Sequence, residues 1–253
     1  MIQVGIDVGA KFIKAVVLKD GKLVAKDQTP SGFEGKENAK KIYDQVLQKA
    51  GISPDEVNSI TSTGSGRKVV DFATKSITDV TAAARGTTSL FPEVHTVIDV
   101  GAEEGRSIRC NQEGKVVDFS INEKCAAGAG AFTEAMARAL EIPLEKFGDL
   151  SLKSTKEIPM NAQCAVFAES EVVSLLHAKT PKEDIAKAIN DAVASRITSM
   201  VRKVGFEKEI ALIGGVAYNI GFIKSLETDL KEKIIIPEGP EYVCAYGAAL
   251  ITN

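Results

Sequence analysis

The chain has 253 residues and a formal net charge of −3, with 44% hydrophobic and 26% charged residues. This composition is close to the average of globular proteins and excludes an intrinsically disordered chain, a coiled coil and a collagen-like fibre. Because the sequence has no basic excess and no tryptophan, it also argues against a nucleic-acid partner.

The sequence contains no candidate membrane segment. The longest uncharged stretch, 210–223, is shorter than the roughly 20 apolar residues that a spanning helix needs. The N-terminal residues include Asp7 and lack the apolar core of a secretory leader. We therefore expect a cytoplasmic protein that has no membrane partner.

Apolar residues at helical spacing predict a series of helices. The clearest is 182–204, where Ile185, Ile189 and Val193 begin an apolar stripe that ends before Gly205. The predicted helices, in chain order, are 37–50, 79–90, 126–140, 165–177, 182–204 and 220–231. Strands are predicted at 57–62, 95–99, 209–213 and 233–236. Strands that alternate with helices indicate a mainly parallel or mixed sheet flanked by helices.

The sequence also contains an internal repeat. Residues 6–10 read Ile-Asp-Val-Gly-Ala, and residues 98–102, about 92 positions later, read the same. Each copy continues with a tight turn, a second strand, a glycine-containing hairpin and a third strand, and a helix follows. We therefore expect a duplicated α/β fold. A boundary near Pro92 gives an N-terminal lobe of residues 1–93 and a second lobe of residues 94–253.

Each copy of the repeat ends its first strand in an Asp-x-Gly turn, at Asp7 and at Asp99. An aspartate in this position can hold Mg²⁺, usually through water, because this ion keeps much of its hydration shell. The glycines, Gly9 and Gly101, let backbone N–H groups approach a phosphate. One such motif is most often only a turn, but two in equivalent places predict a clamp for the phosphates of a nucleotide and its metal ion.

A glycine pair, Gly214 and Gly215, follows the predicted strand 209–213 and precedes Tyr218 and Asn219, which enter the next helix. A strand, a glycine pair and a helix N-terminus together favour a nucleotide site. A plain strand-to-helix turn explains the same residues equally well when they are taken alone. The sequence has neither a Walker A motif nor a GxGxxG motif, which argues against the P-loop and dinucleotide-binding folds.

The four cysteines, Cys110, Cys125, Cys164 and Cys244, form no Cys-x-x-Cys pair. Their spacings fit neither a zinc ribbon nor a single-chain iron–sulfur motif. In a reducing compartment, the simplest interpretation of each is a free, buried thiol.

Several motifs nevertheless give the chain a family resemblance. The two Asp-x-Gly turns, the Gly-Gly-Val run and the closing residues 245–249 resemble the superfamily of actin, sugar kinases and heat-shock chaperone ATPases. More specifically, 122–128 (Asn-Glu-Lys-Cys-Ala-Ala-Gly) and 164–171 (Cys-Ala-Val-Phe-Ala-Glu-Ser-Glu) resemble the activators of 2-hydroxyacyl-CoA dehydratases and benzoyl-CoA reductases, the BadF/BadG/BcrA/BcrD/HgdC-like ATPase family. Residues 63–67 and 194–196 match as well, so the resemblance covers essentially the whole chain.

The resemblance implies a duplicated actin-like ATPase fold of the ribonuclease H-like type. Its two lobes would enclose a nucleotide cleft, and its last helix would pack back toward the first lobe. It implies catalytic roles for Asp7, Asp99 and Glu103, with ATP or ADP and Mg²⁺ as ligands. The nucleotide, with its adenosine in the second lobe, would be bound by Gly9, Ala10, Lys11, Phe12, Ile13, Lys14, Gly101, Ala102, Gly214, Gly215, Val216, Tyr218, Asn219 and Glu241.

In that family, the cysteines matching Cys125 and Cys164 bind one [4Fe–4S] cluster between the subunits of a homodimer. Two thiolates per chain then suffice for four-thiolate ligation, because a two-fold axis doubles them. Cys125 precedes the start of the predicted helix 126–140, and a helix N-terminus favours an anionic cluster by about 0.3–2 kcal/mol. Cys110 and Cys244 match no ligand position of the family and are expected to be ordinary thiols.

The sequence departs from the family pattern at both phosphate turns. Related chains usually carry Ser or Thr after the first glycine, whereas this chain has Ala10 and Lys11, which removes hydroxyl contacts but keeps the backbone N–H groups. The second turn usually reads Gly-Gly-Gln-Asp and here reads Gly-Ala-Glu-Glu over 101–104. Glu103 can act as a base or position water, but it also repels phosphate, which predicts slow or partner-triggered hydrolysis. Neutral drift is the alternative explanation of both departures.

The resemblance therefore implies an ATP-dependent, oxygen-sensitive one-electron donor that accepts its electron from ferredoxin or flavodoxin. Its own acceptor would be an iron–sulfur partner: a 2-hydroxyacyl-CoA dehydratase, a benzoyl-CoA-type reductase or a double-cubane-cluster protein. Two alternatives stay open, a sugar or N-acetylhexosamine kinase of the same superfamily and a non-catalytic nucleotide-sensing scaffold. A kinase would need a sugar pocket, for which we see no insertion in the sequence, and a scaffold would lack ATP turnover.

Overall fold

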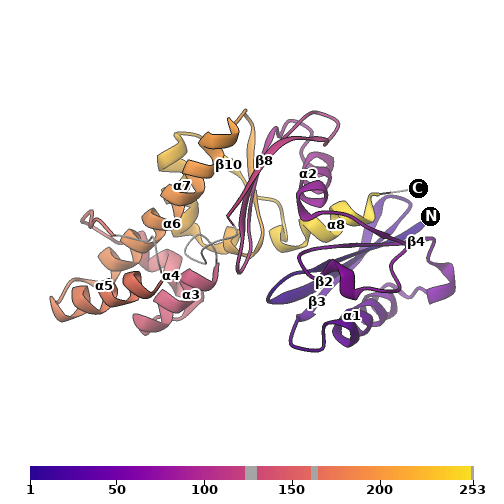
Figure 1. The fold of residues 1–253 in the computed structure, drawn as a ribbon, viewed down its shortest axis with the longest axis horizontal. Coiled ribbons are helices and arrows are strands. Elements are labelled where there is room, and N and C mark those ends of the chain that lie inside the picture. The colour runs from indigo at the N-terminus through magenta and orange to yellow at the C-terminus, as the bar shows by residue number, and fades with distance from the viewer. Residues whose placement is uncertain (123–129, 161–164, 252–253) are drawn as a thin grey trace.

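A computed structural model describes residues 1–122, 130–160 and 165–251 and shows two five-stranded sheets with helices around them (Figure 1). The first sheet has the strand order β3-β2-β1-β4-β5, and the second has the order β10-β9-β6-β7-β8. The strands of the first sheet are β1 (Ile2–Val8), β2 (Phe12–Lys19), β3 (Lys22–Pro30), β4 (Ser59–Thr63) and β5 (Lys75–Ser76). Those of the second are β6 (Thr96–Val100), β7 (Gly105–Cys110), β8 (Val116–Asn122), β9 (Ile210–Ile213) and β10 (Ile234–Ile235).

The two sheets have the same topology. In the first sheet, β1 and β3 both pair with β2 in antiparallel register, and β1 also pairs with β4 in parallel register. In the second sheet, β6 and β8 both pair with β7 in antiparallel register, and β6 also pairs with β9 in parallel register. The duplicated α/β fold that the sequence repeat predicts is therefore confirmed.

The helices agree well with the apolar periodicity. Over the described residues they are α1 (Gly35–Ala50), α2 (Asp79–Leu90), α3 (Gly130–Ala139), α4 (Leu144–Ser151), α5 (Ala165–His177), α6 (Lys182–Val204), α7 (Ile220–Leu230) and α8 (Val243–Ala249). Short 3₁₀ turns lie at η1 (Pro54–Glu56), η2 (Arg67–Val69), η4 (Gly215–Tyr218) and η5 (Pro240–Tyr242). Sequence periodicity missed α4, because this helix is only eight residues long and contains Gly148.

Helices from both halves of the chain complete each core. On the first sheet, α1 covers one face, and α8 covers the other by packing Ala245 and Ala249 against Val16 and Leu18. On the second sheet, a core that includes α3, α4, α6 and α7 covers one face, and α2 lies in the core of the other. Thus α2 precedes the predicted boundary near Pro92 yet packs on the second sheet, whereas α8 follows it and packs on the first.

The two exchanged helices, α2 and α8, lie side by side between the sheets (Figure 1). Their backbones approach closely at two glycines. A Cβ atom on Gly247 would lie 1.9 Å from the carbonyl oxygen of Ala82, and one on Gly86 would lie 2.3 Å from that of Val243. Because even a methyl group does not fit at either position, glycine is required for this helix contact.

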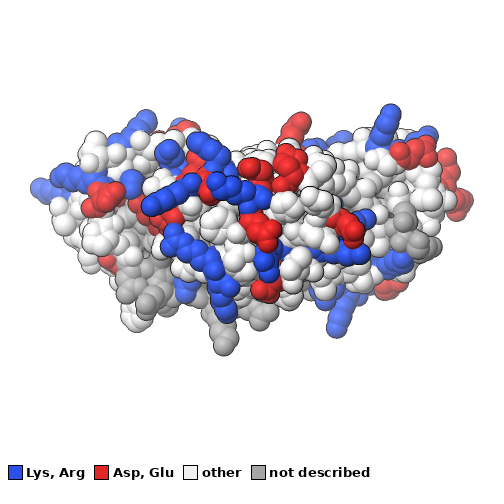
Figure 2. Space-filling view, turned by 90° about the horizontal axis from the view of Figure 1, so that it is seen from above, with Lys and Arg blue, Asp and Glu red and all other residues white. Residues whose placement is uncertain are grey.

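The surface carries charges of both signs. On the face shown in Figure 2, Lys and Arg side chains are interspersed with Asp and Glu over both lobes. This mixture of both signs agrees with the small net charge of the chain. Among the described residues, no helix has the length and apolar character needed to cross a membrane.

Candidate functional site

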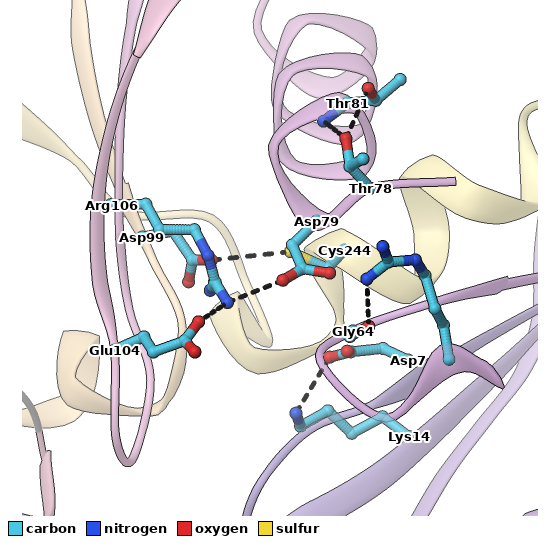
Figure 3. Close-up of polar contacts among 11 residues, drawn as sticks. Asp7, Lys14, Gly64, Thr78, Asp79, Thr81, Asp99, Glu104, Arg106 and Cys244 are labelled. Atoms are coloured by element: carbon cyan, nitrogen blue, oxygen red, sulfur yellow. Dashed lines mark hydrogen bonds and ion pairs between the residues drawn. The ribbon is translucent and has the colours of Figure 1, made fainter. Parts of the chain in front are cut away.

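The two Asp-x-Gly turns carry the same pair of charges at the same place in the two sheets. Asp7 of β1 lies opposite Lys14 of β2, and Asp99 of β6 lies opposite Arg106 of β7. Lys14 Nζ is 3.0 Å from Asp7 Oδ2, and Arg106 Nη1 is 2.8 Å from Asp99 Oδ2. Figure 3 shows these pairs on neighbouring strands of the two lobes. Each repeat therefore positions a carboxylate near the end of its first strand and a cation opposite it on the second strand.

The turns that follow the two aspartates have the same backbone hydrogen bond. Gly9 N–H donates to the carbonyl oxygen of Phe12 at 3.1 Å, and Gly101 N–H donates to that of Glu104 at 2.9 Å. This bond closes each turn tightly between two antiparallel strands. Glycine at the start of each turn keeps side chains away from the backbone there. That the turns bind phosphate stays a prediction.

Each aspartate also approaches a glycine at the end of the next parallel strand. Gly64 follows β4 with a φ of 93°, and Gly214 follows β9 with a φ of 88°. A Cβ atom on Gly64 would lie 2.6 Å from Asp7 Oδ1, and one on Gly214 would lie 2.8 Å from Asp99 Oδ1. Both positions require glycine, because the left-handed backbone and the close approach each exclude a side chain.

Arg106 is the centre of an acidic cluster (Figure 3). Besides Asp99, its guanidinium group contacts Asp79, with Nη2 2.7 Å from Asp79 Oδ2, and forms an ion pair with Glu104. Asp79 is the first residue of α2, which Thr78 caps. Its second oxygen, Oδ1, is buried and has no hydrogen-bond partner among the described residues. A buried carboxylate oxygen without a partner is costly, so this atom fits a site that receives an ion or its bound water.

Both clusters open on one cavity of about 660 Å³ between the lobes. Its volume is typical of sites for small organic ligands. The predicted residues that line it are Asp7, Gly9, Ala10, Lys11, Phe12, Lys14, Asp99, Gly101, Ala102, Glu103, Gly214, Gly215, Val216, Tyr218, Asn219 and Glu241. Ile13 lies elsewhere, because β2 directs its side chain into the fully buried core of the first sheet.

Burial affects the pKa values of three groups that line the cavity floor, Asp99, Lys14 and Cys244. It raises the pKa of Asp99, and the nearby Asp7 carboxylate acts in the same direction, against the opposing effect of Arg106. Burial would lower the pKa of Lys14, but its contact with Asp7 raises this pKa overall. Burial also raises the pKa of the Cys244 thiol, whose Sγ lies 3.9 Å from Asp99 Oδ2. Lys14 therefore stays charged, and Cys244 stays protonated.

The other end of the cavity is formed by η4, η5 and the start of α7. The Tyr218 hydroxyl donates to Glu241 Oε2 at 2.7 Å, and burial together with this hydrogen bond raises the pKa of Tyr218 to about 12. Asn219 caps α7 by accepting a hydrogen bond from Phe222 N–H at 3.1 Å. The accessible aromatic ring and the carboxylate are suited to a flat base and to a sugar hydroxyl group.

The cavity is also lined by residues that sequence reasoning missed. Asp79 and Arg106 had usable signals, since the first begins a predicted helix and the second is the repeat equivalent of Lys14. Cys244 also lines the cavity, although it matched no motif. Glu134 had no local signal, because α3 reaches Lys11, in the turn between β1 and β2, only through the tertiary fold.

The predicted cluster ligands, Cys125 and Cys164, lie outside the described residues. Within the described part, no group of three or more His, Cys, Asp or Glu side chains is arranged to hold a metal ion. Cys110 and Cys244 are free and buried. A Mg²⁺ ion in the cavity would therefore take most of its ligands from water and phosphate oxygens, as this ion commonly does.

Comparison with known proteins identifies the family. Residues 4–252, nearly the whole chain, match the BadF/BadG/BcrA/BcrD ATPase family. The chain belongs to this family. Among similar family proteins, the (R)-2-hydroxyglutaryl-CoA dehydratase activating ATPase of Acidaminococcus fermentans is 38% identical over 248 residues, which cover 97% of this chain and 95% of the relative. A subunit of the benzoyl-CoA reductase of Thauera aromatica is 31% identical over 267 residues, which cover 98% and 92%.

A solved structure of similar fold comes from the same group of activators. It is the activator of the 2-hydroxyisocaproyl-CoA dehydratase from Clostridium difficile with bound ADPNP, with a TM-score of 0.93 and 33% identity, covering 99% of this chain and 93% of that chain. The family resemblance and the actin-like ATPase fold expected from the motifs are therefore confirmed.

Proposed function

We propose that this protein is an ATP-dependent one-electron donor that reduces an iron–sulfur partner through a [4Fe–4S] cluster shared by two copies of the chain. The observation that carries this proposal is the attachment of α3, the helix that follows Cys125, to the second phosphate turn. Gly130 N–H donates to Gly101 O at 2.8 Å. Ala131 N–H donates to Ala102 O at the same distance. A nucleotide that moves this turn would therefore move the helix as well.

The cavity supports the nucleotide part of the proposal. The phosphates of Mg²⁺-bound ATP would lie between the two turns, where Lys14 supplies a positive charge and Asp7 and Asp99 accept hydrogen bonds from water on the metal ion. Bound Mg²⁺ would neutralise phosphate charge during the transfer. The relative solved with ADPNP, an analogue of ATP, supports a triphosphate as the ligand here.

Glu103 is the residue that we assign to the attacking water. It lines the cavity from the second turn, and its carboxylate can accept a proton from water as the water oxygen bonds to the terminal phosphorus. The bond between this phosphorus and the bridging oxygen breaks, and ADP leaves with the electron pair. Because the carboxylate also repels the phosphate, we expect slow hydrolysis in the absence of the partner.

Cys125 and Cys164 are the proposed cluster ligands, two from each copy of the chain. The first described residues after them open α3 and α5, and these helices pack against each other. Met136 of α3 and Val172 of α5 belong to the same buried core. The two helices that follow the cysteines therefore form one packed unit. When bound, the cluster would supply one-electron transfer at a potential set by its charge, hydrogen bonds and exposure.

The relatives indicate the kind of partner. They are named as activators of a 2-hydroxyacyl-CoA dehydratase and as a component of benzoyl-CoA reductase. We propose an acceptor of this class, or a double-cubane-cluster protein, and ferredoxin or flavodoxin as the electron donor. We also propose that the reaction takes place in the cytoplasm.

Iron and sulfide counting on anaerobically purified protein tests the cluster. We expect about four irons per dimer, and we expect both the iron and the brown colour to be lost in Cys125→Ala and in Cys164→Ala. Cys110→Ala is the matched control, because Cys110 is a free, buried thiol of β7. A colourless, iron-free dimer after strictly anaerobic purification would refute the cluster.

Steady-state ATP hydrolysis tests the nucleotide site and separates the alternatives. Asp7→Asn should abolish Mg²⁺-dependent turnover, whereas Asp55→Asn, in the exposed turn η1, should not change it. A sugar kinase would release ADP only in the presence of a sugar, and a nucleotide-sensing scaffold would bind ATP without turnover. Either result would replace the proposed function.

A further inference from the structure

Lys11 and Glu134 form an ion pair across the cavity. Lys11 belongs to the first phosphate turn, between β1 and β2, whereas Glu134 lies on α3 in the second lobe. Both residues line the cavity. Since the backbone of α3 is also bonded to Gly101 and Ala102, this one helix contacts both phosphate turns.

Lys11 differs from the other cations at the cavity floor. The side chains of Lys14 and Arg106 are only 15% and 10% exposed, and each is paired with a buried aspartate. The Lys11 side chain is 47% exposed and its Glu134 partner 25% exposed. A partly exposed ion pair is weak and exchanges its partners readily. Lys11 can therefore leave Glu134 at little cost when a stronger anion enters the cavity.

The position of Lys11 also distinguishes the two turns. In the repeat, Lys11 corresponds to Glu103, so the same site carries a positive charge in one lobe and a negative charge in the other. A phosphate at the end of a nucleotide would be attracted to the first turn and repelled by the second. It would also carry more negative charge than the Glu134 carboxylate with which it competes.

We propose that Lys11 is the residue by which the protein distinguishes ATP from ADP. With a terminal phosphate in the cavity, the Lys11 ammonium group pairs with this phosphate and Glu134 is released. With ADP or no nucleotide, Lys11 pairs with Glu134 and holds α3 to the first lobe. The inference rests on the proposed function, because it needs the nucleotide phosphates in this cavity. It concerns an exchange of ion pairs, in which no covalent bond changes.

Nucleotide affinities of the whole, anaerobically purified protein test this exchange. Titration calorimetry with Mg²⁺-bound ADPNP and ADP should show that Lys11→Met weakens ADPNP binding about tenfold more than ADP binding. Glu134→Gln should strengthen ADPNP binding relative to ADP, since the competing carboxylate is gone. In the Lys11→Met background, Glu134→Gln should have no further effect. Lys40→Met is the control, because it removes an exposed pair with Asp44 on α1, outside the cavity.

Hydrogen exchange gives a second readout that does not depend on affinity. Amides of α3 should exchange faster with ADPNP than with ADP in the unmodified protein, and this difference should disappear in Lys11→Met. The exchange is overturned if Lys11→Met weakens the binding of ADPNP and of ADP equally. It is also overturned if Glu134→Gln still changes the affinities in the Lys11→Met background. Neither result would contradict the proposed function. If the unmodified protein binds neither nucleotide, the proposed function fails and the exchange fails with it.

Discussion

Lys14 and Arg106 occupy the same position of the two repeats, and each faces the aspartate of the neighbouring strand. Their surroundings differ, because Lys14 pairs with Asp7 whereas Arg106 contacts Asp79, Asp99 and Glu104. A planar guanidinium group can donate to several carboxylates in a fixed geometry, which an ammonium group does less well. The duplicated pair has therefore become a simple ion pair in one lobe and a network in the other.

Arg106 should contribute strongly to stability. Replacing it with methionine leaves the buried Asp99 and the mostly buried Asp79 without their positive partner, so we expect a loss of about 3–5 kcal/mol in the free energy of unfolding. Urea unfolding followed by circular dichroism measures this loss, and Arg106→Lys should recover part of it. Lys36→Met, which removes an exposed pair with Asp71, should leave the midpoint unchanged. A similar midpoint for both methionine variants would contradict the network.

Magnesium binding should depend on pH through Asp99. Its pKa is raised by burial, so this carboxyl group takes up a proton at a higher pH than an exposed aspartate does. Because a protonated Asp99 loses the negative charge with which it would accept hydrogen bonds from water on Mg²⁺, the affinity for Mg²⁺-bound ADPNP should fall as the pH is lowered, by up to about tenfold per pH unit. Calorimetric titrations over a pH series measure this dependence. Asp99→Asn should flatten the profile, and an unchanged profile in that variant would exclude Asp99 as its origin.

The contact between α2 and α8 should be intolerant of added volume. Gly247→Ala places a methyl group against the Ala82 carbonyl oxygen, and we expect destabilisation of about 1–3 kcal/mol or more. Thermal unfolding provides the measurement. Gly35→Ala is a suitable comparison, because a Cβ atom there meets Val69 only at ordinary contact distance. If both variants unfold at the same temperature, the result contradicts the close approach of α2 and α8 at Gly247.

The two buried thiols should be unreactive in the folded protein. Burial raises the pKa of Cys110 to about 11 and that of Cys244 well above its usual range, so at pH 8 very little of either is thiolate. Iodoacetamide at pH 8 should modify neither within the time that modifies both in urea. Peptide mass spectrometry distinguishes these sites from the other two cysteines. Rapid native labelling of Cys244 would show that the cavity floor opens to reagents.

The sequence repeat made the fold and half of the site predictable. Equal runs around Asp7 and Asp99 are local signals, and they led to the two turns that line the cavity. Glu134 could not be placed in this way, because it lies on α3 and reaches Lys11 of the first turn only through the tertiary fold. The side chain of Ile13 lies in the core of the first sheet, because alternation along a strand directs every second side chain to the same face.

The exchange of α2 and α8 between the two halves has a consequence for how this chain could be divided. A fragment ending at residue 93 would expose Val16 and Leu18 and carry α2 without the sheet on which it packs. A fragment starting at residue 94 would lack the core residues Val80 and Ala83. No single cut yields two self-sufficient pieces. A recombination event that replaced one half would also remove a helix from the core of the other, so the two halves have to evolve together.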